Sequence, residues 1–396
     1  MMQFKSYDVI KPGTKYDFVG KRHIAVVLSL IVNLAIILWS LPLFHEGLNF
    51  GVDFAGGTEM EVRFEQAVDP SDIRKGVEAL GFEDASVQTY GAPDEHTFLI
   101  RVGRIALMTE ADVQKVVQAV KDAGLPLQTS SFNAEFGDKL DLQFQTPPTV
   151  ERLREVVEAA GIRVREIREE QGITTGSKSF AVITQGIRDQ IERDLGARFG
   201  EAKPQVRRVE YVGPAVGREL RTQGFKAILY ALVLIMVYVG LRFDFRFAPG
   251  AIVALIHDAI VVLGYYAFTG REFNLTSIAV ILTIIGYSVN DTVVIYDRIR
   301  ENQAKHKGMS LAEVVNLSVN DVLGRTFLTS FATALSLIGL LVYGVGTIWD
   351  FSMAMMVGIV TGVYSTWFIA APMSIWLEGR GKKPAHAPAM AARAAK

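Results

Sequence analysis

The chain has 396 residues, of which 50% are hydrophobic, and a formal net charge of −1. It contains no cysteine, which excludes disulfides, iron–sulfur clusters and thiol catalysis. No basic stripe accompanies an aromatic platform, so the composition does not indicate a nucleic-acid-binding protein. Charged residues gather between positions 53 and 221, whereas several apolar stretches of about 20 residues carry almost none. This pattern indicates a membrane protein with a sizeable soluble domain.

Six apolar segments are long enough to cross a bilayer as helices. The first follows Lys21 and Arg22 as the core of a signal peptide would. It is longer than such cores and no Ala-x-Ala site follows it, so we expect an uncleaved anchor. The predicted spans cover residues 23–42, 224–241, 249–268, 275–296, 325–345 and 351–377.

Lysine and arginine residues mark one side of the membrane. They occur in residues 1–22, before the third span, in the segment 297–324 and after the sixth span. The positive-inside rule therefore predicts cytoplasmic termini and a periplasmic segment 43–223. Within 297–324, Leu311–Val322 is predicted as an amphipathic helix on the cytoplasmic surface. The basic, Ala/Pro-rich tail 378–396 is predicted to be disordered.

The external segment contains an internal repeat. Residues 61–64 align without gaps with 141–144, and the same offset aligns Gly81 with Gly161. Each copy reads as strand, helix, two strands and helix, with room for a closing strand, which is the pattern of a ferredoxin-like sandwich. We predict two such lobes, 43–137 and 138–223. The alternative is a chance similarity between two amphipathic α/β units.

The fourth span carries an aspartate inside its apolar run. Placing the Asp291 carboxylate in hydrocarbon costs about 2.5–3.5 kcal/mol on insertion scales. Thr283, Tyr287 and Asn290 share its helical face at spacings of three and four residues. These residues predict a functional site in the membrane. The alternative is an aspartate near the cytoplasmic end that snorkels to headgroups or caps a helix.

Two other spans offer polar partners. The fifth begins with Arg325, and the third carries His257 and Asp258. We predict that these polar faces meet, and that Asp291 alternates between an ionised state paired with Arg325 and an unpaired protonated state, which carries protons. The alternatives are that Arg325 is a positive-inside flank and that the fifth span's hydroxyl groups serve helix packing. Those hydroxyl groups belong to Thr329, Thr333 and Ser336.

Four motifs resemble those of a known family. They are GVDFAGGT at 51–58, YVGPAVGREL at 211–220, GYSVNDTVVIYDRIREN at 286–302, and the pairs at 325–326 and 329–330. Together they resemble the SecD/SecF family of protein-export membrane proteins, in particular its smaller members, over nearly the whole chain.

The resemblance implies an α-helical polytopic membrane protein with six transmembrane helices, of the RND half-transporter type. It also implies an α+β ferredoxin-like periplasmic domain, usually a single lobe, so the apparent duplication is a departure from the family. The implied proton relay is Asp291, Arg325 and Asp258. From the polar faces themselves we predict a supporting pathway of Asn290, Tyr287, Thr329, Ser330 and Thr333. The hinge motifs contain Gly56, Gly57, Gly213 and Pro214.

The implied function is the use of the proton-motive force in late steps of protein export across the bacterial inner membrane. The implied partners are SecD, the SecYEG translocon, YajC, unfolded preprotein in the periplasm and membrane lipids. Protons are the coupling ion, and no enzyme activity, cofactor or metal is expected, because no nucleophile–base constellation, phosphate loop or metal-ligand spacing occurs. Two alternatives are a subunit of an RND-type small-molecule or lipid exporter and a passive membrane scaffold.

Overall fold

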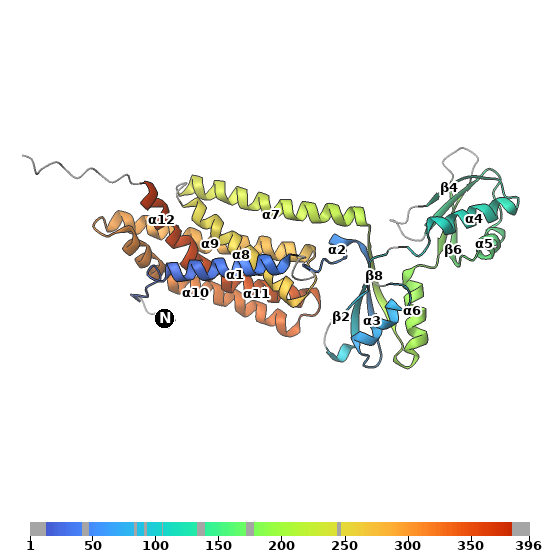
Figure 1. Ribbon diagram of the computed structural model, residues 1–396, viewed down its shortest axis with the longest axis horizontal. Coiled ribbons are helices and arrows are strands. Elements are labelled where there is room, and N and C mark those ends of the chain that lie inside the picture. The colour runs from blue at the N-terminus through green and yellow to red at the C-terminus, as the bar shows by residue number, and fades with distance from the viewer. Residues whose placement is uncertain are drawn as a thin grey trace, which may run out of the picture. The chain divides into compact units, whose positions relative to one another are not determined.

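The computed structural model describes residues 13–41, 47–82, 85–90, 93–104, 106–132, 139–171, 178–243 and 247–381. The chain divides into two compact units, one formed by Met1–Asn49 with Gly224–Lys396 and the other by Phe50–Gln223. The first unit is helical, and the second contains two four-stranded sheets (Figure 1).

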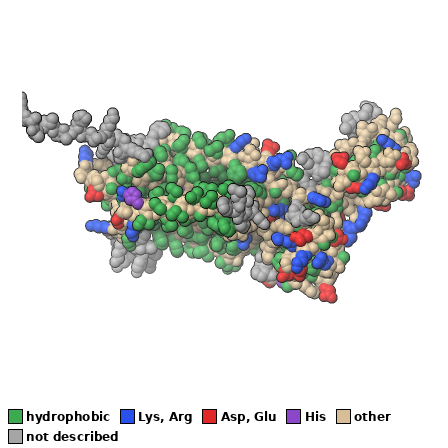
Figure 2. Space-filling view, in the orientation of Figure 1, with side chains coloured by type: hydrophobic (Ala, Val, Ile, Leu, Met, Phe, Trp, Pro, Cys, Tyr) green, Lys and Arg blue, Asp and Glu red, His purple; other side chains and the backbone are tan. Residues whose placement is uncertain are grey.

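Six helices are long and apolar enough to cross a membrane, which confirms the six predicted spans. Apolar side chains cover most of the visible surface of the helical unit (Figure 2). The sixth span is composite, because α11 (Thr347–Ser365) continues through a π-helical turn (Thr366–Ala370) into α12 (Ala371–Gly381). The other five are α1 (Arg22–Ser40), α7 (Pro214–Arg242), α8 (Ala248–Thr269), α9 (Leu275–Lys305) and α10 (Leu311–Tyr343).

The prediction of a separate surface helix before the fifth span is wrong. Helix α10 is continuous from Leu311, and a capping box between Ser310 and Glu313 fixes its start. Val315 and Val319 are fully buried in one apolar cluster with Ile299 of α9. The apolar face of 311–322 therefore packs on α9 instead of lying on a membrane surface, and no proline separates it from the span.

The predicted disordered tail lies largely beyond the described residues. Residues 378–381 belong to α12, whereas 382–396, like the first twelve residues of the chain, lie outside the described part.

Helices α8, α9 and α11 form the centre of the helical unit. About half of the apolar part of each is buried within the unit, compared with 17% for α1, α7 and α10. Small residues permit close approach between α8 and α1 and between α11 and α9. A Cβ atom at Gly264 of α8 would come within 2.8 Å of Ile36 of α1, and one at Gly358 of α11 would collide with Ile284 of α9.

The second unit contains two antiparallel sheets with strand orders β2-β3-β1-β8 and β4-β5-β7-β6. The element order β-α-β-β-α-β occurs twice along the chain, as the repeat predicts. The first copy comprises β1 (Gly57–Arg63), α3 (Pro70–Glu78), β2 (Ser86–Tyr90), β3 (Thr97–Val102), α4 (Glu110–Asp122) and β4 (Leu127–Phe132). The second comprises β5 (Lys139–Phe144), α5 (Val150–Ala159), β6 (Val164–Gln171), β7 (Lys178–Thr184), α6 (Ile187–Arg198) and β8 (Gln205–Val212).

The two copies exchange their last helix and strand, so the lobe boundary predicted at 137/138 does not hold. Strand β8 pairs with β1, and Ile191 of α6 is buried with Met60 of that sheet. Reciprocally, β4 pairs with β5, and Val116 of α4 is buried with Leu140. The first lobe is therefore β1, β2, β3 and β8 with α3 and α6. The second lobe, β4–β7 with α4 and α5, is inserted between β3 and α6.

Candidate functional site

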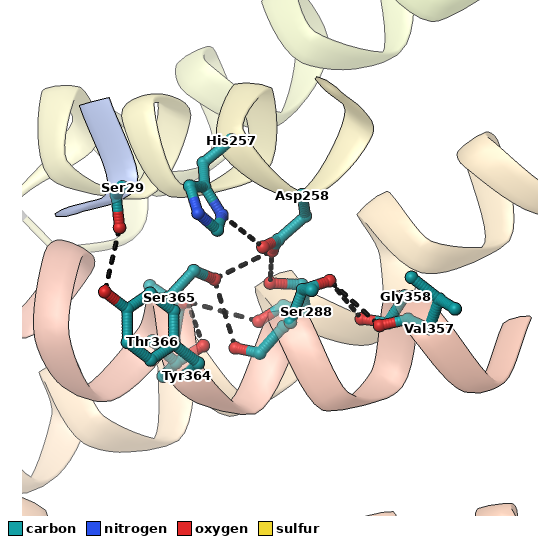
Figure 3. A network of polar contacts seen from close by, with 12 residues as sticks. Ser29, His257, Asp258, Ser288, Val357, Gly358, Tyr364, Ser365 and Thr366 are labelled. Atoms are coloured by element: carbon teal, nitrogen blue, oxygen red, sulfur yellow. Dashed lines mark hydrogen bonds and ion pairs between the residues drawn. The ribbon is translucent and has the colours of Figure 1, made fainter. Parts of the chain in front are cut away.

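Asp258 of α8 is fully buried at the centre of a polar network that joins three helices (Figure 3). Ser288 of α9 and Ser365 of α11 donate hydrogen bonds to its Oδ2 at 2.7 and 2.8 Å. The Nδ1 atom of His257 lies 3.0 Å from its Oδ1. Because a buried polar group is costly without hydrogen bonds, these contacts are what make the Asp258 position tolerable. They also fix the spacing of α8, α9 and α11.

The network does not have the arrangement of a catalytic triad. In a triad the serine hydroxyl gives its proton to an imidazole that a carboxylate orients. Here both serine hydroxyl groups bond to the carboxylate. The geometry therefore suits the holding of a charge or proton, not activation of a nucleophile.

Tyr364 extends the network to α1. Its hydroxyl group donates to the carbonyl oxygen of Ala25 at 2.9 Å and lies 2.9 Å from the Ser29 hydroxyl. The Tyr364 ring also lies against the His257 ring, with centroids 5.8 Å apart. Helix α1, most of whose surface is exposed apolar side chain, is thus anchored to the residues around Asp258.

The packing around Ser288 leaves little spare space. A Cβ atom at Gly362 would lie 3.4 Å from the Ser288 Cβ and 3.7 Å from Asp258 Oδ2. One turn further along α9, the Thr292 hydroxyl donates to the Ser288 carbonyl oxygen at 3.1 Å and lies 3.3 Å from the Thr366 hydroxyl. A side chain as small as alanine at 362 would thus be in ordinary van der Waals contact with Ser288 and Asp258, whereas a larger one would not fit beside them.

Asp291 lies one turn after Ser288 on α9, in a different environment. Its side chain is 5% exposed, yet no hydrogen bond or direct ion pair reaches it from the described residues. Arg325 of α10 interacts with it electrostatically from beyond contact distance. The predicted pair of Asp291 and Arg325 therefore interacts electrostatically but forms no direct ion pair. Ionisable side chains inside membrane spans are rare, and they are candidates for functional sites such as proton relays.

Helix α10 turns its polar face outward. Arg325, Thr329 and Ser336 are exposed, and the Thr329 and Thr333 hydroxyl groups donate to carbonyl oxygens of α10 itself. The predicted meeting of the α9 and α10 polar faces inside this chain is therefore not found for these residues, and Asn290 of α9 is exposed as well.

One pair of predicted pathway residues does come together. The Tyr287 hydroxyl group donates to the Ser330 hydroxyl at 3.4 Å, and Ser330 is buried. The neighbouring Thr326 is also buried, and its hydroxyl has no hydrogen-bond partner among the described residues.

The predicted hinge motifs contact each other within the second unit. Gly56 and Gly57 have φ of +79° and +120°, a region that favours glycine. A Cβ atom at Gly56 would lie 2.8 Å from Pro214 Cα, at the start of α7, and one at Gly57 would collide with the Val102 carbonyl oxygen. Gly213, before α7, accepts a backbone hydrogen bond from Gly217 at 2.9 Å. Both glycines of the motif are thus required by backbone conformation and by space.

Sequence reasoning missed Ser288, Ser365, Tyr364 and Thr366. The usable signal was the pair of glycines at 358 and 362 followed by Ser365 and Thr366, since small residues at four-residue spacing mark close helix packing. Within the described part of the chain, no three His, Asp or Glu side chains gather as metal ligands would.

Two family models match the chain. "Protein export membrane protein SecD/SecF, C-terminal" matches residues 193–380, and "SecD/SecF GG Motif" matches residues 43–68. Protein translocase subunit SecF of Magnetococcus marinus is 34% identical over 371 residues, covering 93% of this chain and 94% of that protein. Protein translocase subunit SecF of Pseudomonas aeruginosa is 34% identical over 369 residues, covering 93% of each chain.

A solved structure is also similar. SecDF from a Thermus species, described as a translocon-associated membrane protein, superimposes with a TM-score of 0.65 at 29% identity over 93% of this chain. This chain spans 39% of that longer one. The two matched family models cover residues 43–68 and 193–380 and leave the second lobe between them unmatched, so the departure from the family stays a prediction.

Proposed function

The chain belongs to the SecD/SecF family of protein-export membrane proteins, and on that premise we propose that it is a subunit of the accessory complex of the Sec preprotein translocase. In this role it uses the proton-motive force to promote late steps of protein export across the bacterial inner membrane. The observation that carries the proposal is the contrast between two buried carboxylates: Asp258 is held by hydrogen bonds, and Asp291 has none among the described residues.

Asp291 is the proton-exchanging group in this proposal. Arg325 of α10 supplies the counter-charge for its ionised form, and a bound proton neutralises the buried side chain. A small displacement of α10 relative to α9 moves the Arg325 charge towards or away from Asp291. Proton uptake by Asp291 and helix movement are therefore coupled. Each proton that moves down a potential of 100 mV supplies about 2.3 kcal/mol. Asp258 keeps α8, α9 and α11 in place during the exchange.

The exposed polar face of α10 supports SecD as the partner that covers it. Arg325 and Thr329 of α10, with Asn290 of α9, are exposed in this chain by itself. Polar and charged side chains in a membrane face protein or water, not lipid. A SecD-type subunit on this face would enclose the Asp291 site. SecYEG, YajC and the preprotein follow as partners from the family alone.

Orientation follows from the positive-inside rule. Basic residues at the end of α9, including Arg298, Arg300 and Lys305, favour the cytoplasm for this end of the helix. The termini are then cytoplasmic and the unit Phe50–Gln223 is periplasmic. In this compartment its sheets hold an emerging polypeptide weakly, through the edge strands β2, β8, β4 and β6.

The test compares Asp291→Asn with native protein in vesicles that contain SecD and SecYEG, with preprotein translocation measured with and without a proton gradient. Asn has the shape of Asp and cannot ionise, so the gradient-dependent part of translocation should be lost while complex assembly is normal. Asp297→Asn, an exposed aspartate on the same helix, is the matched control and should behave as native protein. Undiminished stimulation by Asp291→Asn would refute proton coupling at this site and favour a passive scaffold. Transport of a small apolar substrate in its place would favour an RND-type exporter.

A further inference from the structure

The segment Tyr16–Val19, just before α1, is fastened to α10 by two asparagines. Asn316 Oδ1 accepts from the Phe18 backbone N–H at 2.9 Å, and Asn320 Oδ1 accepts from the Tyr16 N–H at 2.9 Å. Both amide groups also donate to the Tyr16 carbonyl oxygen, at 3.0 and 2.9 Å. Asn316 and Asn320 lie one turn apart on one face of α10. We call the segment Tyr16–Val19 the N-terminal clamp. The two amide groups hydrogen-bond its backbone N–H and carbonyl groups, as the backbone of a neighbouring β-strand would.

The other side of the clamp packs on the π-helical turn. Phe18 is 8% exposed, and its ring lies 5.5 Å from the ring of Trp367 and 5.5 Å from that of Phe368. Both of these residues belong to the turn Thr366–Ala370. A π-helical turn has wider hydrogen-bonded rings than an α-helix and is often found at functional sites. Packing from outside is therefore a physical means of holding this turn in one conformation.

The N-terminal clamp contacts both α10, which carries Arg325, and the π-helical turn that follows α11. Asn320 lies little more than one turn before Arg325 on α10. On the other side, the Phe368 ring lies 5.3 Å from that of Tyr364, which borders His257. The turn also begins directly after Ser365, the residue that donates to Asp258.

We propose that the N-terminal clamp is a positioning element for the proton-exchanging site. It fixes the spacing between α10 and the π-helical turn, so that Arg325 stays within electrostatic range of Asp291 while Ser365 stays bonded to Asp258. Asn316, Asn320 and Phe18 are then positioning residues, which act without contacting the carboxylates. The inference rests on the proposed function for its effect on export, but the contact itself does not.

The first test releases the clamp with the double substitution Asn316→Ala and Asn320→Ala, with Gln303→Ala as an exposed amide control on α9. Hydrogen exchange of the backbone amides of 362–370 is measured in the intact chain with its SecD partner. We expect exchange about fivefold faster or more in the double variant, the loss typical of a removed hydrogen bond, and no change in the control. Unchanged exchange would overturn the proposal.

The second test restores the clamp covalently. Because the chain has no cysteine, Tyr16→Cys with Asn320→Cys gives a single pair for a disulfide or a short bismaleimide. We expect the reduced variant to lose most of the gradient-dependent part of translocation, and crosslinking to restore it in the same vesicles, with SecD association unchanged throughout. Translocation that stays low after crosslinking, or falls further, would overturn the proposal, because a positioning element does not need to open.

Asp291→Asn in the same vesicles separates the two ideas. If Asp291→Asn exports normally, proton coupling at that residue fails, and the hydrogen-exchange result still decides whether the clamp holds the turn. If Asp291→Asn is defective while clamp variants export normally, only the positioning proposal fails.

Discussion

Replacing Gly358 with alanine should destabilise the helical unit, although alanine is the better helix former. The added Cβ atom would collide with Cγ1 and Cδ1 of Ile284 and lie 3.1 Å from its Cγ2, whereas carbon atoms pack best at about 3.5–4.0 Å. Ile284 is 1% exposed and branched at Cβ, so it has little freedom to move aside. Overpacking of this kind costs about 1–3 kcal/mol.

Gly286→Ala is the matched control on the facing helix. A Cβ atom at Gly286 would have no atom within 4 Å, so this variant gains the helix propensity of about 1 kcal/mol without a clash. Because both variants make the same chemical change, the propensity gain cancels in the comparison. We therefore expect Gly286→Ala to be the more stable of the two by about 1–3 kcal/mol.

Thermal unfolding of the purified chain in detergent, followed by tryptophan fluorescence, measures the difference. For a unit of this size, 1 kcal/mol corresponds to about 2–4 °C in Tm. Adding Ile284→Val, which removes Cδ1, should recover part of the loss in Gly358→Ala, with a coupling energy of about 0.5 kcal/mol or more. Equal Tm values for Gly358→Ala and Gly286→Ala, or no coupling to Ile284→Val, would refute close α9–α11 packing at this position.

Two further substitutions test the second unit. Gly57→Ala should lower the stability of this unit, because φ is +120° and the added Cβ atom meets the Val102 carbonyl oxygen. Hydrogen exchange of the first lobe in the full chain measures the loss. Gly81→Ala, with φ of +89° and open space, should lower the stability less. Hydrogen bonds from Lys115 and from the helix cap lower the pKa of Asp112 to about 2, so its stabilising effect is present above its ordinary pKa near 3.8 and is lost as the pH falls towards 2. Asp112→Asn should therefore speed exchange in α4 at pH 7, by the equivalent of about 0.5–1 kcal/mol, and this difference should disappear as the pH falls below 2. An equal effect at pH 7 and below pH 2 would contradict this assignment.

The membrane spans and the position of Asp291 follow from local sequence. An apolar run of fixed length can satisfy its backbone in a bilayer only as a helix, so the six spans need no knowledge of tertiary contacts. The same argument identifies Asp291 as a candidate functional residue, because placing a carboxylate inside such an apolar run costs insertion free energy. What it contacts is not local. Among the described residues, tertiary packing leaves Asp291 without a hydrogen bond or ion pair, whereas Ser288 and Ser365, neither of them predicted, donate hydrogen bonds to Asp258.

The repeat of the external unit shows the same division. Alternating strands and amphipathic helices in matching order indicate two ferredoxin-like lobes, because each element's buried face is encoded in its own residues. Strand β1 is equally compatible with β4 or β8 by pattern, since these strands occupy equivalent places in the two copies. Only the folded chain decides that β1 pairs with β8, and thereby inserts the second lobe into the first.

The sequence by itself determined the membrane class, the spans, the repeated lobes and the family motifs, because each depends on hydrophobicity, spacing or residue identity within a short stretch. The tertiary structure alone decided the exchange of half-repeats, the outward direction of the α10 polar face, and the clamp that joins Tyr16 to Asn320. In each of these features, a strand, helix face or segment adopts one of several positions that its local sequence allows. Such choices depend on contacts between residues far apart in the chain, which no periodicity in the sequence records.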